Sequence, residues 1–494
     1  MTTDAGAQYP IVETTAGAVR GFRRGDSDVF LGIPYAEVPF GERRFLAPEP
    51  RARWSGVRDA LEYGPTPQRK ALAEVTAIPE PSIPGEDILS VNVFTPSARP
   101  ADGSGLPVLV YIHGGGYVAG SPASPWYDGA AFNRDGVVLV VISYRLGFEG
   151  FGWLPDAPAN RGILDWILAL EWVRDNIGTF GGDPAQVTIA GQSAGGGAVM
   201  TLLTLPGARG LFSRVAALSP APADITLAVA ELATTTLAER LGIEGDRAGF
   251  ASVPEAELLN AIGGGFSPLE RPTAESLIAA SRGMGGLITF GPVVDGDLVP
   301  APIGESVRAG AGADIPLLIG STRDEFSGLA LGHRSLFDSW EPEELLRQLG
   351  LDAATAAAYV GSLNGDHAAE ALGQYTTDLV FRRHTRAWAD ARRGPAPTWV
   401  YDFAWPSGIG GISGHCLDVP FVFDVLAHPH VATIAGADAP QSLADTVHGA
   451  YAAFIRDGLP GWQAYDEAGA VMVWDAQPHV ETGTYDSAQV LVGS

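Results

Sequence analysis

The sequence predicts an α/β fold built on a mostly parallel sheet with helices on both faces. Two continuous β-branched apolar runs, at residues 108–112 and 137–143, read as buried strands. Apolar residues recur at helical spacing over 163–177, and a third strand at 187–190 leads directly into a small-residue helix from 194 to about 203. Strands that alternate with helices in this way are typical of parallel sheets covered on both sides.

Each of these elements has a visible beginning or end. The strand at 108–112 runs into a glycine-rich loop, and the strand at 187–190 breaks at Gly191. The helix at 163–177 follows Asn160, a residue type favoured at the N-cap, so we expect Asn160 to cap it. The glycine-rich stretch 178–182 ends that helix.

The second half of the chain has weaker signals. Helices are predicted at 227–241 and 353–360, and strands at 317–319 and 399–403. No stretch repeats at a fixed period, and the one linker-like segment, 99–105, is short enough to be a surface turn. The glycine-rich and polar segment 263–290 is a candidate for part of a cap over a site.

Composition bounds the class of protein. The 494 residues are 46% hydrophobic and 18% charged, which suits a large core and is too little charge for disorder. The net charge of −26 repels phosphate backbones and anionic lipid headgroups, so neither nucleic acid nor a membrane is an expected partner.

Location is predicted from what the sequence does not show. The longest apolar run, 137–142, is far too short to cross a bilayer, and the first residues have no secretory signal pattern. The single cysteine, Cys416, cannot form an internal disulfide, which agrees with a reducing compartment. We therefore expect a cytoplasmic protein.

The segment Gly191-Gln192-Ser193-Ala194-Gly195 fits the Gly-x-Ser-x-Gly elbow of a nucleophilic serine. In that motif a tight strand-to-helix turn lifts the hydroxyl out of the sheet, and here a strand precedes the serine and a helix follows it. The competing interpretation is an ordinary glycine turn.

A second motif, His113-Gly114-Gly115-Gly116, ends the first predicted strand. Bare glycines let backbone N–H groups converge on a developing oxyanion, which acyl transfer requires. Its presence upstream of the elbow favours the nucleophile over a simple turn.

A serine nucleophile needs a base and an acid that orients the base. In α/β-hydrolases the chain order is Ser, then Asp or Glu, then His. Spacing alone leaves the base open among the histidines that follow Ser193: His333, His367, His384, His415, His428, His430, His448 and His479. His415 lies in a glycine-rich loop from which it could reach a site. The histidines show no metal-ligand spacing, so zinc chemistry is not expected.

The chain strongly resembles the type-B carboxylesterases, the family of bacterial para-nitrobenzyl esterases, animal carboxylesterases and cholinesterases, with an α/β-hydrolase fold. The resemblance covers nearly the whole length. Its motifs, in order, are Gly32-Ile33-Pro34-Tyr35-Ala36, Glu86-Asp87-Ile88-Leu89-Ser90-Val91-Asn92-Val93, Asn160-Arg161-Gly162, Phe180 to Gly196, Phe290 to Gly296, and His415 to Phe423. It implies one domain over 1–494 with cap insertions at roughly 220–290 and 325–395.

The resemblance also implies roles for individual residues. Ser193 takes the place of the nucleophile, His415 that of the general base and Glu325 that of the acid, with Asp324 as the alternative acid. The oxyanion donors would be the amides of Gly115, Gly116 and Ala194, and Ser219 corresponds to a serine near the triad.

Several positions depart from the family pattern, among them Pro220, which stands where glycine usually follows the residue at 219. Gln192 stands where glutamate usually precedes the nucleophile, so a charge beside the histidine is missing. Phe326 stands where glycine commonly follows the acid, and its ring is expected to face the pocket. Ile88 replaces a cysteine that forms a disulfide in secreted relatives.

The expected activity is hydrolysis of carboxylic esters through an acyl-enzyme, without a cofactor. Small neutral or aromatic esters are the expected substrates, in a pocket near Tyr117, Trp126 and Phe326; carbamates and bulky aromatic diesters are the alternatives. A non-catalytic adhesion-type relative is a remote alternative, because every catalytic position is occupied.

Overall fold

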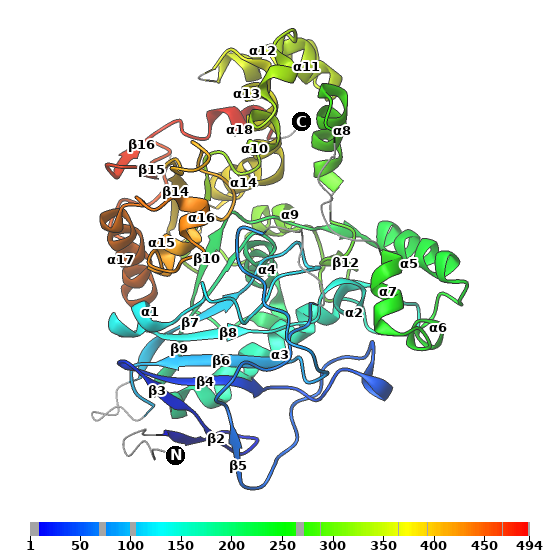
Figure 1. Ribbon diagram of the computed structural model, residues 1–494, viewed down its shortest axis with the longest axis vertical. Coiled ribbons are helices and arrows are strands. Elements are labelled where there is room, and N and C mark those ends of the chain that lie inside the picture. Colours follow the sequence, from blue (N-terminus) through cyan, green and yellow to red (C-terminus); the bar gives the residue numbers. More distant parts are fainter. Residues whose placement is uncertain are drawn as a thin grey trace.

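An 11-stranded sheet runs through the computed structural model (Figure 1). The structure describes residues 9–68, 76–98, 105–262, 271–286, 288–363, 365–392, 394–466 and 468–492. From one edge to the other, the strands are β16 (His479–Glu481), β15 (Val471–Trp474), β14 (Thr398–Phe403), β13 (Leu317–Thr322), β10 (Arg214–Leu218), β9 (Gly182–Gln192), β7 (Leu106–Ile112), β8 (Val138–Ile142), β6 (Ser90–Thr95), β4 (Ser27–Pro34) and β3 (Phe22–Arg24).

The centre of this sheet is parallel, as predicted. Each neighbouring pair from β15 through β14, β13, β10, β9 and β7 to β8 runs parallel. The edges are antiparallel: β6, β4 and β3 continue the sheet on one side, and β16 closes the other. These edge strands had no counterpart in the prediction.

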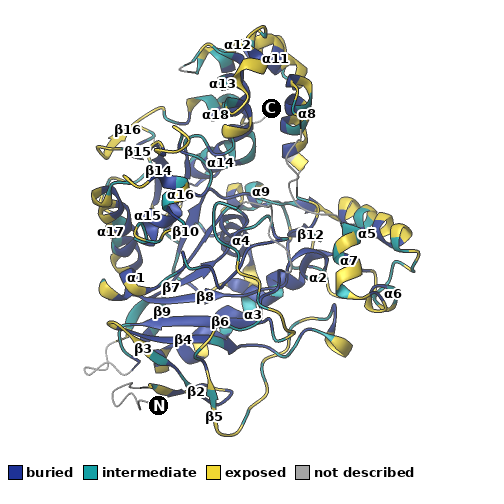
Figure 2. Cartoon of the chain, in the orientation of Figure 1, coloured by how far each residue is buried: buried dark blue, intermediate teal, exposed yellow. Residues whose placement is uncertain are grey.

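The central strands are buried on both faces, which explains their continuous apolar runs. Val108, Val110 and Ile112 of β7 join one core cluster, with residues of helices α3 (Arg161–Asn176) and α4 (Ala194–Thr204). Leu109 and Tyr111 face the opposite way, into a second cluster with α17 (Gln441–Asp457). Figure 2 shows these central strands as the dark, buried part of the molecule.

The cap prediction for Asn160 is wrong. Asn160 does occupy the N-cap position of α3, but its backbone is left-handed (φ 56°) and its side chain makes no capping hydrogen bond. Its amide instead pairs with the backbone of Val293, accepting from N at 2.8 Å and donating to O at 2.8 Å. Asn160 thus ties the start of α3 to the short strand β12 (Val293–Val294).

Two helical regions stand away from the sheet (Figure 1). One contains α5 (Leu227–Leu241), α6 (Arg247–Ala251) and α7 (Glu255–Ile262). The other contains α8 (Ala274–Gly283), α10 (Gly328–Leu331), α11 (Pro342–Gln348), α12 (Ala353–Gly361) and α13 (Ala368–Thr377), which share a third apolar cluster. These helices fall within the segments predicted as insertions. Residues 99–104 of the predicted linker, and 263–270 and 287 of the glycine-rich segment, lie outside the described residues.

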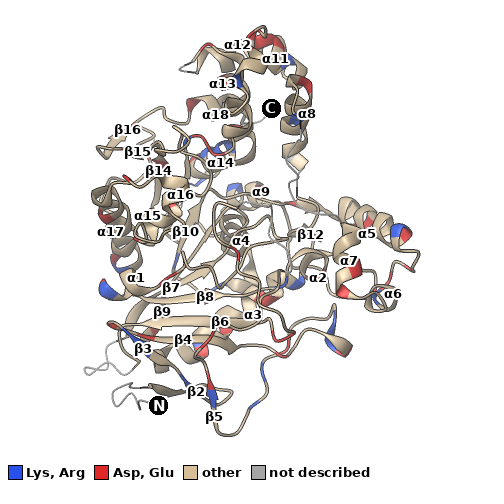
Figure 3. Cartoon of the chain, in the orientation of Figure 1, with Lys and Arg blue, Asp and Glu red and all other residues tan. Residues whose placement is uncertain are grey.

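Most charged residues lie on the outer helices and loops, and the central strands carry few (Figure 3). Within the described ranges, no helix is both long and apolar enough to span a membrane.

Candidate active site

The predicted elbow is present at the end of β9. Ser193 follows the strand directly and α4 begins at the next residue. Its backbone has φ 59° and ψ −121°, a conformation that L-residues rarely adopt and that is found at functional turns. A Cβ on Gly191 would collide with the carbonyl of Gly195, so this turn requires glycine. The hydroxyl is carried on a half-buried residue at the start of a helix.

The glycine loop after β7 lies against this serine. A Cβ built on Gly114 would be 3.1 Å from the Cβ of Ser193. Gly115 and Gly116 both have positive φ, 112° and 61°, and neither amide donates to another group in the described part of the chain. The amide of Ala194, the first residue of α4, has no acceptor within the helix. The three predicted oxyanion donors are therefore next to Ser193 or on the adjoining loop.

His113 holds the same glycine loop through its side chain. Its side chain is fully buried, its Nδ1 lies 2.9 Å from the carbonyl of Gly114, and its ring stacks on Tyr144. Burial lowers the pKa of His113 to about 4, so the ring is neutral at physiological pH. It supports the loop and is not a candidate base.

The predicted acid and base meet. Nδ1 of His415 is hydrogen-bonded to Oε2 of Glu325, whose carboxylate is fully buried. The other carboxylate oxygen accepts the N–H of Thr322 at 2.9 Å, and the His415 N–H donates to the Glu325 carbonyl at 3.0 Å. Glu325 itself has a left-handed backbone, φ 22°. Both the side chain and the main chain of the acid therefore hold the histidine.

Asp324, the alternative acid, faces elsewhere. Its carboxylate accepts the N–H of Ser413 at 2.8 Å, and its own N–H donates to the Ser413 carbonyl at 3.0 Å. Burial raises the pKa of Asp324, against the effect of the Ser413 hydrogen bond. The side chain thus fastens the loop that carries His415, whereas the contact with the imidazole belongs to Glu325.

The second ring nitrogen of His415 meets Gln192. The two Nε2 atoms are 3.2 Å apart, so the Gln192 amide can donate to the neutral imidazole. In the described part of the chain, the Ser193 hydroxyl is not hydrogen-bonded to this nitrogen. Catalytic hydrogen bonds are often long before substrate binds, and Ser193 directly follows Gln192 in the chain. At the position where relatives carry a glutamate, this chain therefore places a neutral amide against the second ring nitrogen of the histidine.

The environment of His415 favours its charged form. Burial alone would lower the pKa of the imidazole, but the neighbouring Cys416 and the hydrogen-bonded Glu325 carboxylate raise it, and the pKa lies well above its usual value of 6.5. A carboxylate that stabilises imidazolium in this way lowers the energy of the state formed when a serine gives up its proton.

Phe326 lies beside the histidine, and its place in a substrate pocket stays a prediction. Its ring meets the imidazole of His415 edge-on, with centroids 5.0 Å apart and planes at 64°. A second ring beside the histidine was not predicted: the Phe381 ring centroid lies 4.7 Å from that of the imidazole, with the two planes at 31°. Phe381 is distant in the chain and comes from a helical stretch, so no motif could have found it.

Three further predicted residues are deeply buried. Ser219 follows β10, has φ 43°, and its hydroxyl has no hydrogen-bond partner within the described ranges. Tyr117 and Trp126 are fully buried and pack in the two main core clusters, Tyr117 against Phe151 and Trp126 against His430. Their part in a substrate pocket stays a prediction.

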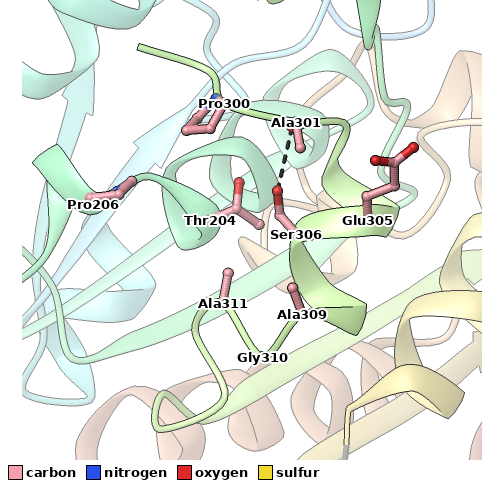
Figure 4. Close-up of a pocket in the computed structure, with 9 residues that line it drawn as sticks. All are labelled: Thr204, Pro206, Pro300, Ala301, Glu305, Ser306, Ala309, Gly310 and Ala311. Carbon is pink, nitrogen blue, oxygen red and sulfur yellow. Dashed lines mark hydrogen bonds between the residues drawn. The ribbon is translucent and has the colours of Figure 1, made fainter. Parts of the chain in front are cut away.

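A separate hollow of about 590 Å³ lies at the far end of α4 (Figure 4). It is lined by Thr204, Pro206, Pro300, Ala301, Glu305, Ser306, Ala309, Gly310 and Ala311. None of these residues was predicted to act in catalysis. Within the described ranges, no group of three or more His, Cys, Asp or Glu side chains is placed to hold a metal ion.

A serine on an elbow, a paired histidine and carboxylate, and a glycine loop at the ends of parallel strands define a serine hydrolase with the α/β-hydrolase fold. The model of the carboxylesterase family matches residues 8–487. The chain therefore belongs to the carboxylesterase family, and it is a serine carboxylesterase, a hydrolase of carboxylic esters.

Similar proteins cover almost the whole chain. The para-nitrobenzyl esterase of Bacillus subtilis (strain 168) is 34% identical over 96% of both chains. The phenmedipham hydrolase of Pseudarthrobacter oxydans is 32% identical over 94% of this chain and 95% of that one. The structure of a Geobacillus stearothermophilus carboxylesterase superposes with a TM-score of 0.81 at 35% identity, covering 97% of this chain and 99% of that one.

The buried carboxyl of Asp418, whose charge interacts with those of Glu325 and His415, leads to a prediction about stability. Asp418 is fully buried; Tyr401 donates to its Oδ2 at 2.9 Å, and its Oδ1 has no partner in the described part of the chain. Burial and the nearby Glu325 charge raise its pKa from 3.8 to about 7. A raised folded-state pKa stabilises the fold at low pH, and this stabilisation is lost as the pH rises from about 4 to about 7.

Asp418→Asn should therefore be at least as stable as wild type at pH 8. The free energy of unfolding of the variant minus that of wild type should be about 1–4 kcal/mol larger at pH 8 than at pH 5. The asparagine keeps an oxygen for Tyr401 and removes the charge. Urea unfolding of both proteins at the two pH values measures this difference. Exposed Asp297→Asn is the matched control, and an unchanged difference for Asp418→Asn between pH 5 and pH 8 would contradict the prediction.

Proposed function

We propose that Ser193, His415 and Glu325 form the catalytic triad, with the amides of Gly115, Gly116 and Ala194 as the oxyanion hole. The observation that carries this proposal is the buried Glu325 carboxylate on Nδ1 of His415, with Nε2 turned toward the elbow segment at Gln192. Ser219 is assigned a supporting place near the triad.

The geometry supports the following sequence of steps. His415 takes the proton of Ser193 as the hydroxyl oxygen attacks the ester carbonyl carbon, and the amides bind the oxyanion. Imidazolium then gives the proton to the departing alcohol, which leaves an acyl-enzyme. Water, activated by the same histidine, releases the acid and restores the serine. No step needs a cofactor.

We propose small neutral or aromatic esters as the substrate class. Two phenylalanine rings beside His415, and the absence of a carboxylate at position 192, favour uncharged and aromatic groups over cationic ones. The names of two relatives, a para-nitrobenzyl esterase and a phenmedipham hydrolase, agree with aromatic substrates.

A substrate panel tests this proposal: para-nitrophenyl acetate and butyrate, a triglyceride, an aryl carbamate, a phthalate diester and a choline ester. We expect the highest kcat/KM for the neutral aryl esters. Carbamate or diester as the best substrate would move the chain to one of the alternative specificities on the same triad. Hydrolysis of none of them would point to the non-catalytic alternative.

The panel also tests Gln192. Gln192→Glu should shift the acidic limb of the pH profile of kcat/KM upward by about one unit or more. The Gln192 amide nitrogen lies 3.2 Å from Nε2 of His415. A carboxylate in its place should favour imidazolium, raise the pKa of His415, and remove free base at mildly acidic pH. Activity on the choline ester should rise relative to the neutral ester.

The measurement is kcat/KM against pH for para-nitrophenyl acetate, with Gln477→Glu as the control that adds the same charge at an exposed site. An acidic limb that stays in place in folded Gln192→Glu would mean that residue 192 does not sense the charge of the histidine.

We also propose that the chain is a single domain over 1–494 whose insertions at roughly 220–290 and 325–395 cap the site. The helices of these segments and the contact of Phe326 and Phe381 with His415 support a cap that includes the second insertion. A cytoplasmic location is proposed on the single cysteine alone.

A further inference from the structure

The hydrogen bonds of His415 leave the faces of its ring without polar support. Glu325 binds Nδ1 and Gln192 contacts Nε2, and both contacts lie at the ring edge. Contacts at the edge fix where the nitrogens are but only weakly resist tilting of the ring. A base that must take a proton from one atom and give it to another depends on that tilt, because misplacement by about 1 Å can cost 100-fold in rate.

Two phenylalanine rings supply the missing contacts. The ring of Phe381 is tilted by 31° to the imidazole, with centroids 4.7 Å apart, and Phe326 meets the imidazole edge-on at 5.0 Å. The two rings also touch each other, with centroids 5.0 Å apart and planes at 77°. Phe381 is buried to 1% exposure, whereas Phe326 is half-buried. The imidazole is thus part of a three-ring cluster.

The position of Phe381 depends on an unusual backbone. Between α13 and α14 (Arg383–Ala391) the chain makes a π-helical turn, η6 (Asp378–Arg382), which contains Phe381. Such turns insert a residue into a helix and are frequent at functional sites. The turn changes the direction in which the following side chains project.

Buried ion pairs hold this turn at both ends. Asp378 and Arg382 pair with each other at 3.3 Å, and Arg382 also binds Asp402 of β14 at 2.7 Å. The second oxygen of Asp402 binds Arg323 at 2.7 Å, two residues before Glu325. Asp378, Arg382 and Asp402 are no more than 2% exposed, so breaking this network would strand buried charges.

A further hydrogen bond joins the same two segments. Thr377, directly before the turn, donates its hydroxyl proton to the carbonyl of Asp324 at 2.9 Å. The acid loop and the turn that carries Phe381 are therefore held as one unit. The acid reaches the histidine at Nδ1 and Phe381 reaches it at the ring face.

We propose that Phe381, backed by Phe326, is a positioning residue for ester hydrolysis: its ring holds the imidazole of His415 in the plane that joins Glu325 to Ser193. This rests on the proposed triad. The ring face also meets the positive charge that imidazolium gains during the reaction, and aromatic faces attract cations. Phe381 acts through His415 and forms no bond with substrate.

The test compares two esters that differ in their need for a proton. Nitrophenol leaves as an anion, whereas an aliphatic alcohol must receive its proton from imidazolium. Phe381→Leu keeps apolar volume and removes the flat ring. We expect kcat to fall about tenfold for para-nitrophenyl butyrate and about 100-fold for an ethyl ester, with KM changed less than about threefold.

Matched variants separate positioning from folding. Phe337→Leu removes an equally buried ring from the third apolar cluster and should lower Tm without changing the ratio between the two esters. Phe381→Tyr, which keeps the ring, should restore most of the ratio. If Phe381→Leu does not fold, Phe326→Leu at the half-buried ring should show the same selective loss at smaller size.

The outcomes are distinct. Wild-type kcat on both esters, or an equal loss on both accompanied by a fall in Tm like that of Phe337→Leu, overturns the positioning role. A failure of the proposed triad shows differently, as activity that survives in Ser193→Ala.

Discussion

Ser193→Ala should lower kcat/KM for para-nitrophenyl butyrate by about 10⁴ or more. The serine hydroxyl oxygen is the atom that attacks the carbonyl in the proposed mechanism, and the other elbow residues, Gly191, Gln192, Ala194 and Gly195, carry no nucleophile. The residual rate should come from the glycine loop and from substrate binding, which still favour the oxyanion.

The fold should tolerate this substitution. Ser193 is half-buried, and its hydroxyl makes no hydrogen bond among the residues that the structure describes. Alanine at φ 59° is strained no more than serine. Tm should therefore stay within about 2 °C of wild type. Ser143→Ala is the matched control, a buried serine at the end of β8 whose hydroxyl has no partner within the described residues.

Labelling gives an independent measurement. A fluorophosphonate should modify wild type and Ser143→Ala at Ser193, as shown by peptide mass, and leave Ser193→Ala unmodified. Turnover that persists after treatment while Ser193 remains free would require another nucleophile.

The parallel core of the sheet was predictable because its signal is local. A strand buried on both faces must be apolar at every position, and the runs at 108–112 and 137–143 are. The edge strands β3, β4 and β6 were not predicted, because polar and charged residues such as Asp28 and Asn92 interrupt their apolar pattern. Asn160 shows the limit of a local rule, since its side chain pairs with Val293, 133 residues away.

The parts of the candidate site that consist of contiguous sequence motifs could be predicted. The elbow and the glycine loop are contiguous in the chain, so they could be located from spacing alone. The choice of His415 and of Glu325 needed the family resemblance, because eight histidines follow Ser193 and spacing alone does not single out the base. No motif predicted Phe381 or the buried ion pairs of Arg382 with Asp378 and Asp402. The one available signal was Asp402, a charge inside a buried strand.

The assignment of the acid is the part of the site that sequence left between two neighbouring residues, and it gives the second large effect. Glu325→Gln should lower kcat for an aryl ester by about 10³ to 10⁴. A glutamine at this place can donate to Nδ1, which stabilises the imidazole with its proton on Nε2. That tautomer cannot accept the proton of Ser193.

Asp324→Asn should cost less than about tenfold in kcat. Its carboxylate accepts the N–H of Ser413, and the oxygen of asparagine can accept the same hydrogen bond. The two variants make the same chemical change, acid to amide, in adjacent residues of one loop. Any general disturbance of the loop should therefore appear in both.

The decisive measurement is kcat for both variants on para-nitrophenyl butyrate, with Tm recorded for each. A loss in Glu325→Gln at least 100-fold larger than in Asp324→Asn, with similar Tm, identifies Glu325 as the residue that holds the imidazole tautomer. The reverse ranking would transfer the role to Asp324. His415 would then have to leave Glu325 when substrate binds, because among the described carboxylates only Glu325 accepts the hydrogen bond of Nδ1 in the structure.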